Sequence, residues 1–224
     1  IDRIIGGLEK RGNIISPDEK KTIAIHESGH ATVSWMLKHA SPLVKVTIVP
    51  RGKSLGAAWY LPEERHITTT EQLMDEMAAL LGGRAAEEVL IGKVSTGALN
   101  DLERATKQAY AMVVYYGLSK LGNISYYDSS GEREYSFSKP YSEKTAEEID
   151  IEVHSIIDEA YQTAKKILSE NKDKLTQLAK QLQEKEVIFT EDMEKIYGKR
   201  AFEIENIEQP KEDKTTENSE NITA

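Results

Sequence analysis

The chain has 224 residues, a net charge of −9 at neutral pH and no cysteine. An acidic chain of this kind is a poor nucleic-acid binder, because phosphate contacts need a basic face. The lack of cysteine excludes disulfides and thiolate ligands, so that any metal must be held by histidines and carboxylates.

Residues 1–16 are expected to form a connector, and the first well-marked helix follows it. Ser16 is suited to the N-cap, Pro17 to the first helical position and Glu19 to the third, which together make a capping box. We expect this helix to run from Pro17 to about His39, since a proline follows shortly afterwards.

The helix contains the pattern H-E-x-x-H. His26 and His30 are four residues apart, so they share one helix face and can reach the same metal ion. Glu27 follows the first histidine, and its carboxylate can reach a water molecule on that ion. Zinc lowers the pKa of bound water to about 7, and a carboxylate can accept the proton as the water attacks a carbonyl. The pattern therefore predicts a zinc-dependent peptidase; the alternative is a chance match.

A β-hairpin is expected next, with one strand near residues 44–49 and a second that ends before Pro62. The small residues of the second strand would let another backbone approach closely. Two interpretations remain open for this strand: it binds an extended substrate peptide along its edge, or it is an ordinary strand under a helix. In the first interpretation the substrate-binding residues are Leu55, Gly56, Ala57, Ala58, Trp59 and Tyr60.

A second helix is expected to begin with a capping box from Thr68 to Glu71 and to end at Gly92. The pair Gly82 and Gly83 lies inside it. Because glycine lowers helix stability, this pair indicates close packing against another backbone.

Further helices complete the domain. A turn at residues 95–101 leads into a third helix that ends at Gly117, and an irregular segment follows. Ser142 then caps a long helix whose apolar pattern is interrupted near Asn171, and a last short helix begins after Thr190.

The predicted fold is mostly α, of the α+β class, with one small hairpin or sheet near the active site. Residues 17–202 are expected to form this domain. Residues 203–224 contain seven acidic and two basic side chains and no aromatic residue, which predicts a disordered acidic tail.

A catalytic zinc site needs three protein ligands and one open position. Val33 and Met36 stand where a metzincin has glycine and histidine, which excludes that subclass. A carboxylate must therefore complete the site, and the alternatives are Asp101, Glu87 and Glu88. We favour Asp101 because it is short and starts a helix after a glycine-containing turn, whereas Glu87 would then orient a histidine through its other ring nitrogen.

A family resemblance rests on five segments that occur in order: HESGHA at 26–31, the hairpin at 46–62, LGGRAAEE at 81–88, STGALNDL at 95–102 and KPYS at 139–142. Over residues 2–202 the chain resembles the peptidase domain of FtsH-type, membrane-anchored, ATP-dependent zinc metalloproteases. Ser28 stands where alanine is frequent in that family, a small-for-small difference.

The resemblance implies a helical, zincin-like metallopeptidase that degrades unfolded membrane and soluble proteins. It implies that His26, His30 and Asp101 bind one catalytic zinc ion. It also implies that Glu27 is the catalytic base and that Glu87 lies just behind the ligands. Residues 1–16 would then connect the domain to an upstream AAA+ ATPase module and a membrane anchor, in a homo-hexamer.

ATP is expected to be used by that upstream module, because this chain has no G-x-x-x-x-G-K-[ST] phosphate loop. The expected location is the bacterial inner membrane with the peptidase domain on the cytoplasmic side, or, as the alternative, the mitochondrial inner membrane. The rival to the protease hypothesis is a catalytically silent oligomerisation module, built on the long helices after Ser142.

Overall fold

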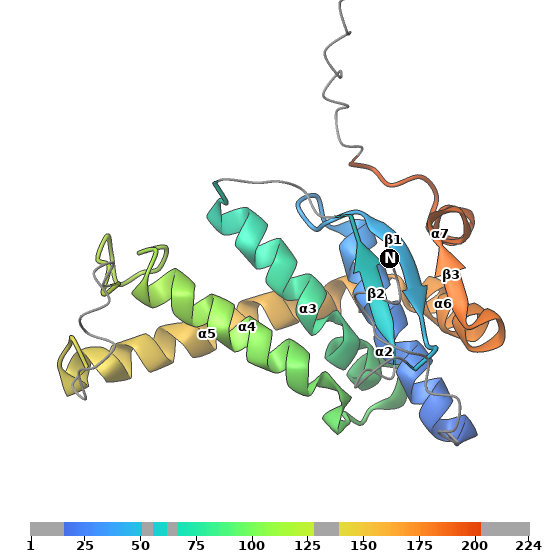
Figure 1. Ribbon diagram of the computed structural model, residues 1–224, viewed down its shortest axis with the longest axis horizontal. Coiled ribbons are helices and arrows are strands. Elements are labelled where there is room, and N and C mark those ends of the chain that lie inside the picture. Colours follow the sequence, from blue (N-terminus) through green and yellow to red (C-terminus); the bar gives the residue numbers. More distant parts are fainter. Residues whose placement is uncertain (1–15, 51–55, 62–66, 128–138, 203–224) are drawn as a thin grey trace, which may run out of the picture.

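The computed structural model describes residues 16–50, 56–61, 67–127 and 139–202 (Figure 1). Within these ranges the chain is mostly helical with one small antiparallel sheet, as expected for the α+β class. Most of the expected connector and the whole acidic tail lie outside the described residues. No helix in the described part is both long and apolar enough to cross a membrane.

Helix α2 (Pro17–Met36) is the centre of the fold. It begins as expected, because Ser16 Oγ accepts a hydrogen bond from the Glu19 amide over 3.2 Å. It ends at Met36, earlier than the expected His39, since Leu37 has an extended backbone. All residues from 24 to 35 are buried, because helices cover one side of α2 and the sheet covers the other (Figure 1).

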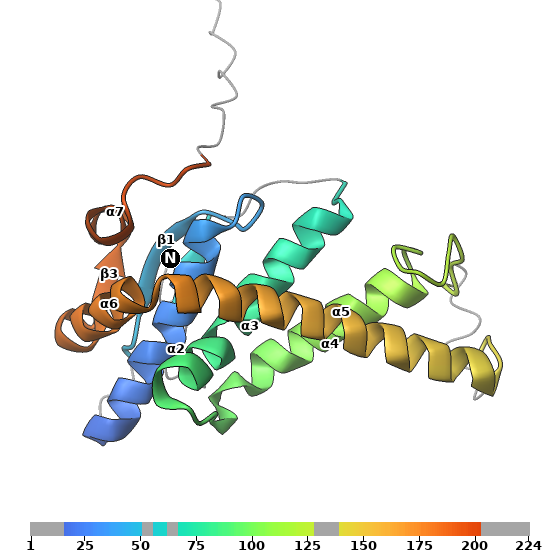
Figure 2. The ribbon, with the colours of Figure 1, turned by 180° about the vertical axis from the view of Figure 1, so that it is seen from behind.

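Three helices form the layer on one side of α2: α3 (Thr70–Ile91), α4 (Leu99–Val114) and α5 (Glu143–Glu170). Their apolar faces meet in the larger of two hydrophobic clusters. Figure 2, the view from behind, shows the long α5 crossing in front of α3 and α4. A short 3₁₀ helix, η1 (Thr96–Ala98), leads directly into α4.

The start of α3 differs from the expectation by one residue. Thr69 is the N-cap, and its capping box is completed by Gln72, whose side chain accepts from the Thr69 amide over 2.8 Å. The predicted box from Thr68 to Glu71 was wrong because both pairs match the same pattern. The C-terminus was correct: Gly92 caps α3 in the left-handed conformation, with φ of 73°.

The sheet contains β1 (Leu43–Thr47), β2 (Ala57–Tyr60) and β3 (Val187–Phe189) in the antiparallel order β2-β1-β3. The hairpin of β1 and β2 was expected, and β3 was not. Val46 on the central strand lies opposite Ala58 on one side and Ile188 on the other. Because β1 pairs with both neighbours, β2 lies at an edge of the sheet among the described strands.

The C-terminal part closes the second hydrophobic cluster. Helix α6 (Lys172–Lys185) follows α5 after the expected break at Asn171, and α7 (Thr190–Tyr197) ends at Gly198. These helices pack with the sheet against the second side of α2. Thr32 on α2 and the Tyr197 hydroxyl share a hydrogen bond of 2.7 Å across this contact.

The contact between α2 and α3 depends on glycine. A Cβ atom on Gly82 would lie 2.8 Å from the carbonyl oxygen of Gly29, and one on Gly83 would lie 2.6 Å from ring carbons of His26. The close packing predicted for the glycine pair is therefore present, and α3 approaches the histidine face of α2 at backbone distance.

Candidate metal centre

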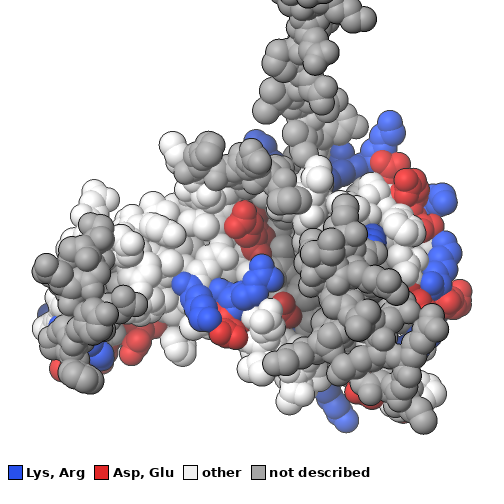
Figure 3. All heavy atoms as spheres, in the orientation of Figure 1, with Lys and Arg blue, Asp and Glu red and all other residues white. Residues whose placement is uncertain are grey.

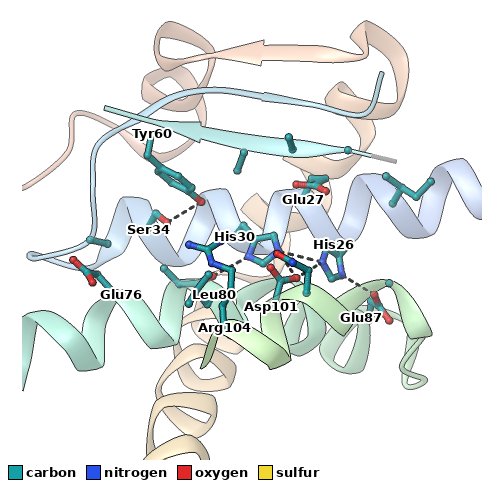
Figure 4. A pocket seen from close by; sticks show the side chains of 18 of the residues that line it. His26, Glu27, His30, Ser34, Tyr60, Glu76, Leu80, Glu87, Asp101 and Arg104 are labelled. Carbon is teal, nitrogen blue, oxygen red and sulfur yellow. Dashed lines mark hydrogen bonds and ion pairs between the residues drawn. The ribbon is translucent and has the colours of Figure 1, made fainter. Parts of the chain in front are cut away.

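A cleft with a volume of about 840 Å³ runs along α2, between β2 on one wall and α3 and α4 on the other. Acidic and basic side chains gather over α3 and α4 beside it (Figure 3). The floor of the cleft holds the histidine pair of α2 and the first turn of α4 (Figure 4).

Three potential metal ligands converge in this cleft. His26 Nε2 lies 3.1 Å from His30 Nε2, and Asp101 Oδ2 lies 3.2 Å and 3.4 Å from these two nitrogens. Zinc bonds of about 2.0–2.1 Å in a tetrahedral arrangement place neighbouring donor atoms about 3.3–3.4 Å apart. The spacing of the three donor atoms therefore fits a zinc ion.

The other ring nitrogen of each histidine is fixed by an acceptor. His26 Nδ1–H donates to Glu87 Oε1 over 2.7 Å, and His30 Nδ1–H donates to the Ala79 carbonyl over 2.9 Å. These partners can only accept, since a carbonyl and an ionised carboxylate carry no proton. Both Nε2 atoms are thereby directed at the same point, as in histidine–metal sites.

The pKa values indicate that the cluster favours a positive charge at its centre. Burial lowers the pKa of His26, but the hydrogen bonds to Asp101 and Glu87 outweigh it and raise that pKa to about 9. Burial likewise raises the pKa of Asp101, while the hydrogen bonds from His26 and His30 hold it well below its usual range. A cation among these three groups, whether a proton or a metal ion, is electrostatically favoured.

Glu27 lies on the same helix, between α2 and the start of β2 (Figure 4). Burial raises the pKa of its carboxyl group, and the nearby imidazoles of His30 and His26 oppose that rise. A Cβ atom on Gly56 would lie 2.6 Å from Glu27 Oε1, so the strand passes directly over the carboxylate. A buried carboxylate with a raised pKa is suited to accept a proton near neutral pH.

The structure separates the two adjacent glutamates of α3. Glu87 is buried and contacts both His26 and Ser95, whose amide donates to Glu87 Oε2 over 2.5 Å. Burial raises the pKa of Glu87, but the hydrogen bonds from His26 and Ser95 lower it more. Glu88 points to the other side of α3, where Lys165 Nζ donates to it over 2.7 Å, and so it does not reach the cleft.

The expected substrate-binding strand divides between two faces. Gly56, Ala57, Ala58 and Tyr60 line the cleft. Trp59 does not: its ring lies under the ammonium of Lys45, 5.2 Å from the ring centre. Because side chains alternate along a strand, Trp59 faces away from its neighbours Ala58 and Tyr60, although Ala57 also lines the cleft. Leu55 lies outside the described residues.

Sequence reasoning did not identify several other residues that line the cleft, among them Ser34, Glu76, Arg104 and Gln108. For two of them, the spacing from a predicted metal ligand could have indicated a position in the cleft. Ser34 is one helical turn beyond His30, and its hydroxyl donates to the Tyr60 hydroxyl over 3.2 Å. Arg104 is one turn beyond Asp101, so it shares the cleft-facing side of α4.

Comparison with known proteins agrees with this geometry. The model of peptidase family M41 matches residues 13–196. A bacterial protein from Parabacteroides distasonis, an ATP-dependent zinc metalloprotease FtsH, is 62% identical over 98% of this chain. The mitochondrial ATP-dependent zinc metalloprotease FTSH 10 of Arabidopsis thaliana is 51% identical over 90% of it, and the mouse mitochondrial inner membrane m-AAA protease component AFG3L2 is 47% identical over 90%.

These relatives are longer than this chain. The matched region makes up 33% of the P. distasonis protein and 25% of each of the two mitochondrial proteins. The chain thus spans between a quarter and a third of the length of these relatives.

Proposed function

The chain belongs to peptidase family M41, and on that premise we propose that it hydrolyses peptide bonds as the zinc-dependent peptidase part of an ATP-dependent protease. The observation that carries the proposal is the convergence of three donor atoms, all within 4.8 Å of one another, at the floor of a large cleft.

In the proposed site His26 Nε2, His30 Nε2 and Asp101 Oδ2 are the zinc ligands. A zinc ion held there supplies a water molecule with a pKa of about 7 and polarises a carbonyl group. The donor set supports zinc, because imidazole and carboxylate are ligands that zinc accepts in catalytic sites. Glu87 keeps His26 in the tautomer whose Nε2 faces the ion.

Glu27 is the proposed general base. It accepts a proton from the attacking water and then passes it to the leaving amine, so that one carboxylate serves both halves of the hydrolysis. Its burial supports this role, because a carboxylate removed from bulk water has a raised pKa and a stronger tendency to bind a proton.

The substrate is proposed to lie extended along the edge strand β2, with main-chain hydrogen bonds to the strand and side chains in the cleft. The edge position of β2 supports this arrangement over the alternative of an ordinary covered strand. Gly56, Ala57 and Ala58 are small enough for a second backbone to approach them.

The rest of the proposal concerns the longer protein. The names of two relatives describe ATP-dependent zinc metalloproteases, and a third names a component of the mitochondrial inner membrane m-AAA protease. We infer an AAA+ module that hydrolyses ATP and feeds unfolded membrane and soluble proteins to a homo-hexamer, anchored in a bacterial inner membrane or a mitochondrial one. In this arrangement residues 1–16 are the connector and residues 203–224 an acidic tail.

A catalytically silent oligomerisation module is the rival function. Such a module does not require two histidines directed at one point with an aspartate and a buried glutamate beside them. This arrangement therefore favours the protease function. The proposed test is casein degradation by the longer native protein, with ATP, before and after zinc removal by a chelator. We expect activity that the chelator abolishes and added zinc restores. Glu27→Gln should keep its zinc and lose at least about 100-fold in rate; equal activity in that variant would contradict the proposal.

A further inference from the structure

Arg104 projects into the cleft from the same helix as Asp101. In Figure 4 its side chain rises from α4 beside His30 and extends toward the Tyr60 hydroxyl on the opposite wall. The pKa of Tyr60 agrees with this placement. Burial raises that pKa, and the positive charge of Arg104 is among the effects that oppose the rise. The guanidinium therefore lies inside the cleft, on the Tyr60 side of the three ligand atoms.

This guanidinium is available to a ligand. Among the described residues Arg104 makes no hydrogen bond or ion pair, although an arginine offers five N–H donors. Its neighbours in the cleft are occupied: Ser34 donates to Tyr60, and Gln108 donates to the Leu73 carbonyl. On the outer side of the same helix, Lys107 is paired with Glu103 and does not line the cleft.

The geometry of an extended peptide indicates what Arg104 meets there. Carbonyl groups two residues apart in a strand point to the same side and lie roughly 6.6–6.8 Å apart. A peptide paired with β2 directs every second carbonyl away from β2, toward α4, which forms the opposite wall (Figure 4). The scissile carbonyl belongs to this set, because it must face the three ligand atoms.

The next carbonyl of that set lies within the reach of Arg104. Arg104 is one helical turn beyond Asp101, about 4.5 Å along α4, and its long side chain extends further toward Tyr60. The wall near Arg104 is not purely basic, since Glu76 also lines the cleft (Figure 4).

We propose that Arg104 is a substrate-positioning residue that donates hydrogen bonds to the main-chain carbonyl two residues from the scissile carbonyl, on the Tyr60 side. The inference rests on the proposed peptidase function and on a substrate paired with β2. Recognition of the main chain fits a protease that must accept many sequences, since every peptide presents this carbonyl.

The test compares Arg104→Met, Arg104→Lys and Lys107→Met in the longer native protein, on a short fluorogenic peptide. Hydrogen bonds to charged groups are worth enough that Arg104→Met should lower kcat/KM about tenfold or more. Arg104→Lys should keep part of the activity, because it retains the charge without the planar fork. Lys107→Met removes the same charge from the outer side of α4 and should match the wild type, and all variants should keep one zinc per chain.

Thioamide peptides, in which sulfur replaces one carbonyl oxygen, test which substrate carbonyl Arg104 contacts. Sulfur accepts hydrogen bonds more weakly than oxygen, so a contacted position should show a loss of rate. A thioamide at the carbonyl two residues from the scissile bond should slow the wild type several-fold and leave Arg104→Met unaffected. A thioamide at the intervening carbonyl, which faces β2, should slow both proteins equally.

Three results would overturn the inference: equal kcat/KM for Arg104→Met and wild type, equal thioamide effects in both, or a loss in Arg104→Met confined to peptides with an acidic side chain. These results can be interpreted only if the wild-type protein cleaves the peptide and a chelator stops the cleavage. A wild type without such cleavage would instead contradict the proposed function itself.

Discussion

Glu87 links the first histidine to the segment that carries the aspartate. Its Oε1 accepts from His26 Nδ1–H over 2.7 Å, and its Oε2 accepts from the Ser95 amide over 2.5 Å. Ser95 caps the 3₁₀ helix that leads into α4, where Asp101 lies in the first turn. One buried carboxylate therefore sets the position of two of the three proposed ligands.

Replacement of Glu87 should weaken zinc binding while the three ligand side chains stay in place. We expect Glu87→Ala to lower zinc affinity about 10–100-fold, the usual effect of losing a group that orients a ligand. The measurement is competition with a chromophoric chelator. Glu88→Ala is the matched control, since Glu88 contacts Lys165 and Tyr161 instead, and an equal loss in both variants would remove Glu87 from this role.

Asp101 should be more important for zinc content than Glu87. Asp101→Ala leaves only two protein ligands, so we expect the purified variant to contain substoichiometric zinc by elemental analysis. Asp101→Asn keeps the shape of the side chain but not its charge and should also lose zinc. Full zinc in Asp101→Ala together with loss in Glu87→Ala would exchange the roles of the two carboxylates.

Gly83 should be intolerant of a side chain because of the imidazole above it. Alanine normally stabilises a helix interior by about 0.5–1 kcal/mol relative to glycine. Here the added Cβ would lie 2.6 Å from ring carbons of His26. We expect Gly83→Ala to lower zinc affinity, measured by chelator competition, because the ring must rotate away from Asp101. Wild-type affinity in this variant would show that α3 can shift to make room.

The pair of Glu88 and Lys165 should make stability depend weakly on pH. Hydrogen bonds from Lys165 and Tyr161 lower the pKa of Glu88 in the folded chain. The unfolded state then binds more protons, so the contribution is present above the ordinary pKa and is lost as the pH falls through the lowered one. Since the pair is partly exposed, Glu88→Gln should cost less than about 1 kcal/mol at pH 7, and the cost should shrink as the pH falls below the ordinary pKa of a glutamate, measured by urea unfolding.

Local features of the fold could be predicted from the sequence. The start of α2 rests on neighbouring residues, as do the end of α3 at Gly92 and the break at Asn171. The histidine pair is equally local, because its geometry follows from a spacing of four on one helix. The error at Thr68 is also local: two overlapping capping boxes differ by one residue, and the sequence pattern does not choose between them.

Features that depend on contacts between residues far apart in the sequence were harder to predict. Strand β3 has three residues and exists because it pairs with β1, roughly 140 positions earlier. The choice between Asp101 and Glu87 remained a chemical preference, because their relation to His26 is set by the packing of α3 and α4 against α2. The cleft-facing position of Arg104 depends on the same packing.

The burial of residues 24 to 35 of α2 has a consequence for how the site can change during evolution. Ile25 and Val33 belong to one hydrophobic cluster and Ala24, Ala31 and Trp35 to the other, so this helix has little surface on which substitutions are neutral. Substitutions that change substrate preference are then expected mainly on the wall formed by α3 and α4 and on the edge strand β2. Side chains there face the cleft or only one hydrophobic cluster. The proposed chemistry is held in the buried interior of the fold, whereas substrate selectivity can change at the margin of the cleft.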